Sequence, residues 1–587
     1  MFALLAVVPL VAAAFLALLM NQGQTKAIKY IALAASLASL FMVAMIGLGP
    51  ALQQSFTWFS LASYGFGLVA STAPLNMLML FIVAVMTPLT IVYSIGFMGI
   101  PSEQGRYYFE LCLFAAAMML FSMAGDFLTM LIGWGLLGIT SYLLIGFWYK
   151  RERAPAAARK AITAVLIGDV LMLMAIVIVW NAYHTFVFSS IIGSQVTAPM
   201  QVALLLILVA AFTKSAQFPF HEWLPDAMEG PTPVSAFLHS STMVKAGVFL
   251  VAMLLPLFFA YHLLWILLAV GMLTAALGVV NAMAESHIKK ILAYSTIEDL
   301  GLMFVALGLN SVMAAMMLLL VQTFYKALLF MSAGAIMKAN DNEDDIGRLQ
   351  SYTAGRALLA AMVIGALSMA GMIPLSGFFG KVGVEASATN IAVYAVLMVI
   401  GFASSIYTFR WLFIPLRKSG TRPKGTRINF ELLPKSMMVS IYTLAVLAVV
   451  GSLAYVYLPA YLGYRQAALT PVGVAAETAA VLAGIAVAYL FCMRRNSGSL
   501  ISHRLVYALF YNNFVFNGFY ALTARALMIA SSAVDLLNYE LYRFVRVLAN
   551  SVLSFAGLLR RVENGKPNAY MIAFIIGILV VLVMLAL

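Results

Sequence analysis

Residues 211–233 read AFTKSAQFPFHEWLPDAMEGPTP, and they interrupt an apolar run that begins near residue 202. Lys214 stands a few residues before Pro219, and three further prolines follow within the stretch. A proline removes a backbone hydrogen-bond donor and clashes with the preceding turn, so a helix breaks there. A broken helix is tolerated inside a membrane only where it lines a cavity or is covered by protein. The stretch therefore predicts a broken membrane helix that carries a lysine.

A second stretch repeats this pattern later in the chain. Residues 367–385 read LSMAGMIPLSGFFGKVGVE, with Gly371 and Pro374 ahead of Lys381. Paired interruptions in corresponding halves, here about 160 residues apart, are typical of transporters built from inverted repeats, and they mark the ion site. We expect two inverted five-helix repeats, each with one broken helix.

The composition predicts an all-α, polytopic membrane protein. The chain has 587 residues, of which 64% are hydrophobic and 9% charged, and its mean hydropathy is +1.01. The first apolar run lacks a basic leader and a convincing cleavage site, so we interpret it as a retained span and not as a signal peptide. Apolar runs of about 20 residues, each enough to cross ~30 Å of hydrocarbon, predict about sixteen transmembrane helices. They lie near 2–20, 28–49, 73–98, 107–124, 126–148, 158–180, 202–220, 232–255, 258–284, 291–309, 312–337, 355–379, 390–414, 436–458, 474–493 and 568–587.

The net charge of +13 is mainly a topology signal and does not indicate binding to nucleic acid. With the N-terminus outside, the basic loops fall almost wholly on one side, whereas loops 50–72 and 181–201 carry no lysine or arginine, and Arg465 is the exception. Cytoplasmic loops carry the excess of basic residues, so we expect both termini on the outer side of the cell membrane. Basic loops also attract anionic lipid headgroups. The basic side carries Lys26, Lys29, Arg106, Lys150, Arg151, Arg153, Arg159, Lys160, Lys289, Lys290, Arg417, Lys418, Arg422, Lys424, Arg427, Arg494 and Arg495.

Four lysines lie inside long apolar runs: Lys214, Lys245, Lys326 and Lys381. A charge at bilayer depth costs roughly 2.5–3.5 kcal/mol on the lenient insertion scale, so an intramembrane ionisable group is a functional hypothesis by default. A lysine ammonium among apolar side chains loses proton affinity, and a nearby carboxylate restores it. The four lysines therefore predict a relay for protons or other ions. The alternative, lysines that snorkel to the interface, fits a residue near a helix end.

The C-terminal part departs from plain spans. Between residues 504 and 565, charged residues interrupt leucine, valine and tyrosine at roughly helical spacing. We expect a long amphipathic helix along the membrane surface or against neighbouring subunits. The alternative of two short spans is weakened by Arg543 and Arg546 in the middle of the second. The predicted domains are N-terminal transmembrane helices (1–106), a first half-channel (107–255), a second half-channel (256–416), additional transmembrane helices (417–503), the lateral amphipathic helix (504–565) and a terminal transmembrane helix (566–587).

Several motifs resemble a known family. The string KSAQFPFHEWLPDAMEGPTPVSAFLHSSTMVKAGVFL, at 214–250, is similar to the signature of the antiporter-like subunits of respiratory complex I. Further family-like segments are IKKILAYSTIEDLGLMFVALG, FYKALLFMSAGAIM, AGMIPLSGFFGK and LLGITSYLLIGFWYK, and together they cover most of 107–385. The resemblance is greatest to the largest, distal subunit, whose tail is similar to the helix and span predicted at 504–587. The same superfamily includes multi-subunit cation/proton antiporters and membrane-bound hydrogenases.

The resemblance implies roles for residues of the first half. Lys214 matches the lysine of the first broken helix, a proton-accepting centre of the pump. Asp169, in LIGDVLM, matches an acidic residue of the span after the first basic loop. His239, in SAFLHSS, matches a histidine that bridges toward the centre, and Lys245 stands six residues later, where some relatives carry lysine and the distal subunit often carries threonine.

In the second half, the resemblance points to two lysines, and helix spacing adds one acid near the second of them. Lys326, in FYKALLF, matches the linking lysine of this half, and Lys381, in SGFFGK, matches the lysine of the second broken helix, nearest the exit. Glu385 follows Lys381 by one turn if the helix continues, and it would then hold that lysine charged at rest, although a surface pair near the interface is equally open. For Glu298 and Asp299, adjacent in ILAYSTIEDLGLM, we expect at least one at the membrane interface, because adjacent carboxylates at depth are costly unless they are protonated or paired, and a relay role for the other stays open.

The chain also departs from the family pattern. A glutamate normally follows the tryptophan of the fifth span, but here Trp134 is followed by Gly135. Lys214 must then be partnered by Asp169, by another carboxylate such as Asp126, or by water. The histidines that precede the lysine of the second half are replaced by Leu318 and Gln322. We interpret Trp134 itself as a packing or lipid-facing residue, like the many other aromatic side chains.

The resemblance, together with the tail predicted at 504–587, implies a proton-translocating membrane subunit of a complex I-like oxidoreductase. Such a complex would be linked to NADH, deazaflavin or ferredoxin, and the subunit would be coupled to redox chemistry in other subunits. The chain has no glycine-rich nucleotide loop, no CxxC cluster and no Ser/His/Asp arrangement, so we expect no cofactor and no metal in it. Flavin, iron–sulfur clusters and quinone are expected in a hydrophilic redox arm and other partner subunits. The expected membrane partners are other antiporter-like and small subunits, together with lipid. Two alternatives stay open: a subunit of a multi-subunit sodium/proton antiporter, and a structural subunit with a damped channel.

Overall fold

The computed structural model describes residues 2–20, 25–61, 64–99, 103–194, 197–349, 355–416 and 433–494, together with Arg543, Arg546 and Asn550. Its elements are α1 (Phe2–Leu5), α2 (Val8–Leu19), α3 (Thr25–Gly47), β1 (Gln53–Leu61), β2 (Tyr64–Ser71), α4 (Pro74–Phe97), α5 (Gln104–Ser122), α6 (Phe127–Ile145), α7 (Arg153–Tyr183), α8 (Phe188–Ile191), α9 (Ala198–Lys214), α10 (Trp223–Asp226), η3 (Ala227–Glu229), α11 (Thr232–Leu238), η4 (Met243–Lys245), α12 (Ala246–Met253), α13 (Leu255–Ala260), α14 (Leu264–Ala284), α15 (Ile288–Gly308), α16 (Val312–Ala339), α17 (Arg356–Ala370), α18 (Ser376–Ala386), α19 (Ile391–Leu416), α20 (Lys435–Val450), η6 (Gly451–Leu453), α21 (Ala454–Leu462), α22 (Pro471–Tyr489) and η7 (Leu490–Arg494).

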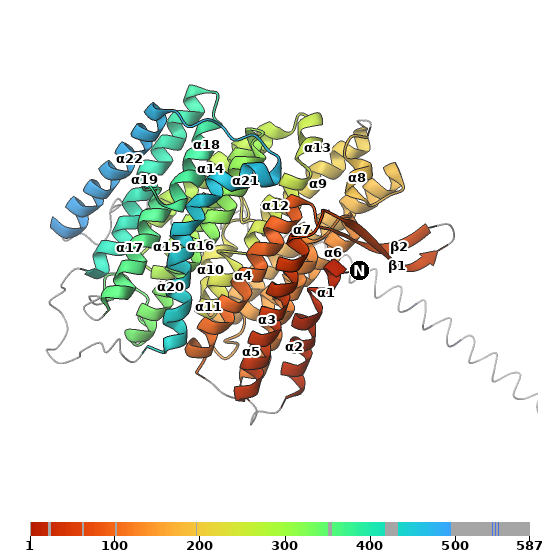
Figure 1. The fold of residues 1–587 in the computed structure, drawn as a ribbon, viewed down its shortest axis with the longest axis horizontal. Coiled ribbons are helices and arrows are strands. Elements are labelled where there is room, and N and C mark those ends of the chain that lie inside the picture. The colour runs from red at the N-terminus through yellow and green to blue at the C-terminus, as the bar shows by residue number, and fades with distance from the viewer. Residues whose placement is uncertain are drawn as a thin grey trace, which may run out of the picture. The chain divides into compact units, whose positions relative to one another are not determined.

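The all-α prediction is confirmed, apart from one β-hairpin, for the described residues of the compact unit Met1–Tyr511. Its helices run side by side (Figure 1), with α14 packed along α15, α7 along α9, and α16 against both α15 and α18. Among the described residues, eleven helices are long and apolar enough to cross a membrane. Three shorter apolar helices, α2, α9 and α17, occupy three more of the predicted spans. The figure of sixteen stays a prediction, because α5, in the predicted span 107–124, is not among these fourteen helices and 568–587 lies outside the described residues.

The C-terminal unit, Asn512–Leu587, is described at three residues alone: Arg543, Arg546 and Asn550 are helical and exposed. The lateral helix expected at 504–565 and the terminal transmembrane helix at 566–587 otherwise lie outside the described residues and stay predictions.

Both predicted helix breaks are present. Helix α9 ends at Lys214 and the next helical turn, α10, begins at Trp223, while α17 ends at Ala370 and α18 begins at Ser376. Gly371 caps α17 with φ +85°, a left-handed conformation that glycine adopts without steric cost. A third break, between α11 and α12, was not predicted. There the hydroxyl of Ser240 donates to the carbonyl of Ala236 and that of Thr242 to Phe237, which offers the backbone an alternative to the helix.

A β-hairpin replaces the plain loop expected at 50–72. Strands β1 and β2 pair antiparallel from Gln53–Ser71 to Leu61–Tyr64, with a bulge between Thr57 and Phe59. The hairpin projects from the helices in Figure 1. Aromatic and β-branched residues, which favour strands, are frequent in this segment. The segment therefore has a strand-forming composition, which differs from the helix-forming composition of the remaining chain.

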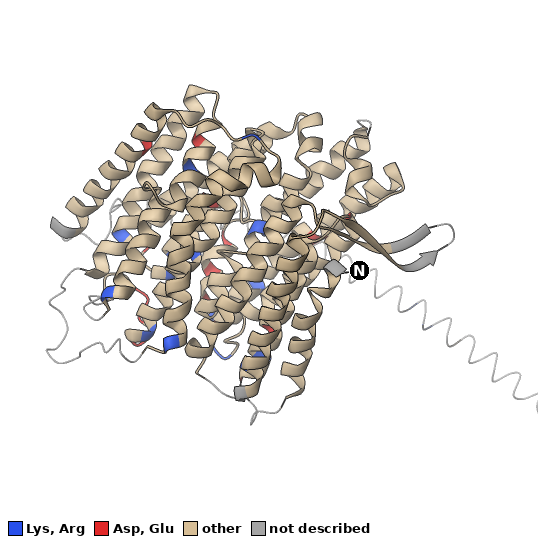
Figure 2. Cartoon of the chain, in the orientation of Figure 1, with Lys and Arg blue, Asp and Glu red and all other residues tan. Residues whose placement is uncertain are grey.

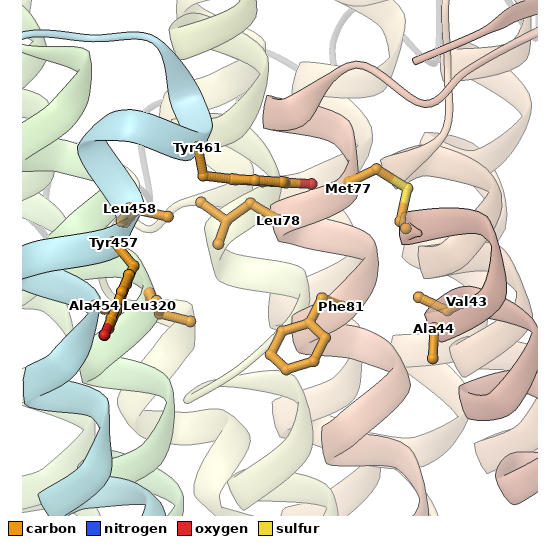
Figure 3. A pocket seen from close by; sticks show the side chains of 11 residues that line it. Val43, Ala44, Met77, Leu78, Phe81, Leu320, Ala454, Tyr457, Leu458 and Tyr461 are labelled. Carbon is orange, nitrogen blue, oxygen red and sulfur yellow. The ribbon is translucent and has the colours of Figure 1, made fainter. Parts of the chain in front are cut away.

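A pocket of about 470 Å³ lies between α3, α4, α16 and α21. Figure 3 shows Phe81 and Leu78 of α4 facing it, with Tyr457 and Tyr461 of α21 across from them. Its lining is aliphatic and aromatic and includes no amine or carboxylate, which distinguishes it from the charged interior of the same unit.

Candidate proton-relay site

Charged residues lie inside the helical unit as well as at its ends. Figure 2 shows blue and red segments part-way along helices in a ribbon that is otherwise almost wholly tan. All four predicted lysines are buried, three of them completely and Lys381 with 3% exposure. The snorkelling alternative therefore does not describe these lysines, and each of them needs a partner inside the protein.

Lys214, at the C-terminal end of α9, forms a triangle with Trp134 and Asp169. Its Nζ atom is 3.4 Å from Oδ1 of Asp169 on α7, and it donates to the carbonyl oxygen of Trp134 at 2.6 Å. It also lies 4.0 Å from the centroid of the Trp134 ring, within range of a cation–π interaction. The indole N–H of Trp134 donates to the same Asp169 oxygen at 2.6 Å. Trp134, expected to be a packing or lipid-facing residue, is thus also a polar partner of both charged groups.

Small residues allow three helices to enclose Lys214. A Cβ atom on Gly168 of α7 would lie 2.0 Å from the Thr213 hydroxyl, and one on Gly247 of α12 would lie 2.3 Å from the carbonyl oxygen of Ala211. Any larger side chain would push these helices apart and admit water or lipid. The close contact of α7, α9 and α12 is therefore what keeps the amine dry.

There is free space at Gly135, where the family has a glutamate. A Cβ atom on Gly135 would meet nothing within 4 Å, and a Cβ atom on Gly138, on the same face of α6, would lie 3.2 Å from Oδ2 of Asp169. Of the two carboxylates considered as substitutes, Asp169 pairs with Lys214. Asp126 instead caps the N-terminus of α6, where its Oδ1 accepts the N–H of Thr129 at 2.9 Å.

Lys245 connects the first half to the second. Its Nζ atom donates to the carbonyl oxygen of Leu319 at 2.7 Å and to the hydroxyl of Thr323 at 2.5 Å, and both partners belong to α16. No carboxylate oxygen of the described residues forms an ion pair with it within 4 Å. Lys245 is therefore held by neutral oxygens, unlike the other three lysines.

His239 and Gln322 are buried polar side chains in the same region. His239, fully buried at the break after α11, lies 6.0 Å from the Trp223 ring, centroid to centroid. Neither its ring nitrogens nor the amide atoms of Gln322 on α16 have a hydrogen-bond partner among the described residues. Buried polar atoms are normally paired, so these two side chains are exceptions within the described interior.

Two adjacent acids on α15 organise the second half. An interfacial acid was expected near a helix end, but Glu298 and Asp299 are both buried and lie midway along α15. Neighbouring residues of an α-helix point about 100° apart, since one turn takes 3.6 residues. Asp299 accordingly pairs with Lys326 of α16 at 3.0 Å, and Glu298 pairs with Lys381 of α18 at 3.5 Å. The two lysine ammonium groups offset the free-energy cost of burying the two carboxylates.

Hydroxyl groups complete both pairs. Tyr325 donates to Oδ2 of Asp299 at 3.1 Å, and Tyr407 of α19 donates to Oε2 of Glu298. Lys326 lies 2.5 Å from the Ser295 hydroxyl, and Lys381 donates to Ser404 at 2.8 Å. Each buried carboxylate thus has an amine and a phenol within reach, which stabilises its charged form.

Glu385 does not pair directly with Lys381. Helix α18 continues through Glu385, as expected, but the ion-pair partner of Lys381 within 4 Å is Glu298. Glu385 instead lies within hydrogen-bonding reach of Glu477 on α22, and both act electrostatically on Lys381. With exposures of 5% and 0%, the two carboxyls are inside the protein and do not form a surface pair. Glu477 was missed in the sequence, although a lone charge in the predicted span 474–493 is the same signal that identified the lysines.

Charged groups also cluster at one end of α7 and α15. Lys160 lies 2.7 Å from Asp226 and 3.5 Å from Glu222, and Lys290 lies 3.9 Å from Asp226. Lys289 donates to the carbonyl oxygens of Met228 and Gly230, next to the first broken helix. The basic residues of these loops are therefore paired with acids and carbonyls around the break.

His287 and Asp344 form a further pair beside α15, outside the membrane-spanning segments. Nδ1 of His287 lies 3.1 Å from Oδ1 of Asp344. Its interaction with the Asp344 carboxylate raises the pKa of His287 above the usual 6.5, and the imidazolium lowers the pKa of Asp344 below the usual 3.8. The pair ties the segment after α16 to the start of α15.

Comparisons with known proteins find similar membrane subunits. Residues 124–408 match the family described as "NADH:quinone oxidoreductase/Mrp antiporter, TM". NAD(P)H-quinone oxidoreductase subunit 5, organellar chromatophore 1, of Paulinella chromatophora is 34% identical over 413 residues, which make up 66% of this chain and 61% of that protein. NADH-quinone oxidoreductase subunit L of Campylobacter jejuni is 29% identical over 548 residues, 90% of this chain and 89% of that protein.

A solved structure has the same fold. A chain in the structure of the Mrp complex from Dietzia sp. DQ12-45-1b superimposes with a TM-score of 0.72 and 23% sequence identity, covering 100% of this chain and 63% of that one. The family match spans α6 to α19 and so includes Asp169 and the two lysine–carboxylate pairs of the second half. This chain is therefore similar to members of the NADH:quinone oxidoreductase/Mrp antiporter transmembrane family, whose pattern its residues 124–408 match.

Proposed function

We propose that this chain is a proton-translocating membrane subunit of a complex I-like oxidoreductase. The observation that carries the proposal is the set of three buried lysine–carboxylate pairs: Lys214 with Asp169, Lys326 with Asp299, and Lys381 with Glu298. Ionisable pairs at this depth are rare unless they serve transport. Two of the relatives described above are named as quinone oxidoreductase subunits, which supports the redox-linked form of the function.

In the proposed mechanism, each lysine alternates between holding and releasing a proton. A carboxylate within 3–4 Å stabilises the ammonium by on the order of 4 kcal/mol at an effective dielectric constant of about 20. If the carboxylate moves away or is neutralised, the buried ammonium loses this energy and gives its proton to water. Glu298 and Asp299 are neighbours on α15, so a change at Lys326 alters the field at Lys381 directly.

Lys245 and the polar side chains around it link the two halves in this proposal. The amine of Lys245 contacts α16 next to Gln322, and His239 stands at the break that leads to it. Water bound at His239 and Gln322 would carry protons between Lys214 and Lys326. Redox chemistry in another subunit would start the sequence, and Lys214, Lys245, Lys326 and Lys381 would pass the charge change along.

The proposal includes partners that the chain does not contain. Flavin, iron–sulfur clusters and quinone are assigned to a hydrophilic redox arm, and the chain itself is assigned no cofactor, so it is the non-redox, ion-pumping part of the translocase. Other antiporter-like and small membrane subunits would be its neighbours. We also propose that both termini lie on the outer side of the membrane, because an excess of lysine and arginine is typical of cytoplasmic loops.

A sodium/proton antiporter subunit is the second candidate. The observation that favours it is Lys245, in TMVKAG, together with the structural likeness to a chain of an Mrp complex. In that case a cation gradient and not electron transfer would drive the same relay.

The two candidates are distinguished in native membrane vesicles that hold the assembled complex. We expect proton uptake when the electron donor is added, and a loss of this uptake in Lys214→Met and Lys381→Met, with electron transfer intact after an uncoupler is added. Sodium-dependent proton movement without a donor would instead identify the antiporter. Wild-type proton uptake in both assembled variants would leave a structural role as the remaining function.

A further inference from the structure

Glu385 and Glu477 meet beside the second broken helix. Two glycines make room for them: a Cβ atom on Gly401 of α19 would lie 3.4 Å from both carboxyl oxygens of Glu477 and 3.8 Å from Oε1 of Glu385. A Cβ atom on Gly371, at the break, would lie 3.3 Å from Oε1 of Glu477 and 3.5 Å from Cδ of Lys381. The two carboxyls and the stem of Lys381 are therefore packed around the same few atoms.

This pair is short of positive charge. Around the second broken helix, four carboxyls of the described residues are buried, Glu298, Asp299, Glu385 and Glu477, and the two amines there, Lys326 and Lys381, form their ion pairs with the first two acids. The buried Glu285 and Arg410 lie elsewhere, near the start of α15, where the guanidinium donates to backbone carbonyl oxygens. Neither carboxyl oxygen of Glu477 has a hydrogen-bond donor among the described residues, and the side chain that interacts with it at close range is the Glu385 carboxyl. Two carboxylates cannot both stay ionised in such a site, because like charges at close range repel and burial adds a desolvation cost. One shared proton between them removes both penalties.

Glu385, one member of the pair, lines two hollows, of which one also contacts Lys381 and the other is open. A small enclosed cavity is lined by Leu302, Lys381, Glu385 and Gly401. On the other side of Glu385, an open cleft of about 320 Å³ is lined by Tyr394 and by residues 468–470 and 472–474 ahead of and within α22. The loop before α22 is on the side opposite the basic loops in the topology predicted above, which makes this cleft the outward one.

We propose that the Glu385–Glu477 carboxyl pair is the proton-release group of this chain. The inference rests on the proposed function and adds its last step. The N–H bond of the Lys381 ammonium breaks, its proton passes to the ionised carboxylate of the pair, and the second proton of the pair leaves to water in the cleft beside Tyr394. The amine becomes neutral and the pair returns to one shared proton, so charge and protons balance.

Infrared difference spectroscopy of the assembled complex tests the resting state of the pair. We expect the carbonyl stretch of a protonated carboxylic acid at neutral pH, shifted in D₂O, in the wild type and in Glu103→Gln. Glu103 is a matched control, because its carboxylate is partly exposed and lies 3.6 Å from Lys150 at a different site. The band should disappear in Glu477→Gln and in Glu385→Gln, which probe the same pair from α22 and α18. If Glu477→Gln does not assemble, Glu385→Gln alone decides, and a band that persists there overturns the inference.

Proton translocation per electron pair, measured on the same variants in proteoliposomes, separates this inference from the proposed function. We expect the proton-per-electron-pair ratio of Glu477→Gln and of Glu385→Gln to fall to that of Lys381→Met, while Glu103→Gln keeps the wild-type ratio. Wild-type ratios in both glutamine variants, with Lys381→Met impaired, would overturn the release group and leave the function standing. A wild-type ratio in Lys381→Met would overturn both. Translocation that requires sodium, with no protonated-acid band, would make the pair a cation site and contradict the proposal.

Discussion

At the scale of single residues, the Lys214–Asp169 pair is the most constrained element of the first half. The amine is fully buried, and the described residues offer it one carboxylate, one carbonyl and one indole ring. Removing one partner of a buried ion pair leaves an uncompensated charge, which costs about 3–5 kcal/mol. Lys214 can avoid this cost by giving up its proton, so loss of Asp169 affects function more than folding.

Asp169→Asn should therefore abolish most proton translocation while the complex still assembles. The amide keeps the size of the carboxylate but not its charge, so Lys214 stays neutral through the cycle. Asp126→Asn is the matched control, because asparagine caps a helix about as well as aspartate. Translocation by vesicles with each variant is the measurement, and normal translocation in Asp169→Asn would show that Lys214 needs no carboxylate there.

Gly135→Glu should restore part of the activity lost in Asp169→Asn. The added side chain starts in open space and on the face of α6 that fronts Asp169, so it can bring a carboxylate to Lys214. A double variant that is no more active than Asp169→Asn would contradict this interpretation of the missing glutamate.

At the scale of elements, the position of Lys381 depends on how closely α18 packs on α17. A Cβ atom on Gly377 would lie 1.8 Å from the carbonyl oxygen of Ser368, whereas the nearest atom to a Cβ on Gly383, on the same helix, is 3.9 Å away. Gly377→Ala should displace α18 and cost roughly 1–3 kcal/mol or more through overpacking, with loss of translocation. Gly383→Ala should be neutral in the same thermal-unfolding and translocation assays. Equal stability of the two variants would mean that this helix contact is not tight.

The His287–Asp344 pair gives the segment after α16 a pH dependence. The raised pKa of His287 means that its stabilisation is complete below pH 6.5 and is lost as pH rises through the higher folded value. The lowered pKa of Asp344 means that its stabilisation is present above pH 3.8 and is lost as pH falls. The pair therefore stabilises the fold in mildly acidic solution, by a small amount because both side chains are 39–52% exposed.

Asp344→Asn should lower the midpoint of thermal unfolding at about pH 5 to 6 and have less effect as the pH approaches 9. The measurement is the midpoint of wild type and variant in detergent across this range. A difference that grows with pH would mean that His287 is not the partner.

At the scale of the whole chain, much of the site could be predicted from residues alone. Lysines in apolar runs and proline-interrupted segments are visible in the sequence, because both break rules of membrane helices. The pairings could not be predicted. Asp299 reaches Lys326 and Glu298 reaches Lys381 because α16 and α18 pack on different sides of α15, and this depends on tertiary structure.

Glu477 and the β-hairpin illustrate two further limits. Glu477 lies near Glu385 because α22 packs against α19 and α18. The sequence of α22 alone does not predict which neighbouring helix this acid faces. The hairpin at Gln53–Ser71 could not be predicted from composition, because the apolar composition of the whole chain predicts membrane helices joined by loops.

In the proposed mechanism the buried lysines pass one charge change from the first half to the second, and loss of Lys326 would break this chain of residues in its middle. The measurement is the number of protons translocated per pair of electrons by the purified complex in proteoliposomes, for wild type and Lys326→Met. We predict a lower ratio in the variant, with electron transfer at the wild-type rate once the membrane is uncoupled. An unchanged ratio in a fully assembled complex would contradict the account.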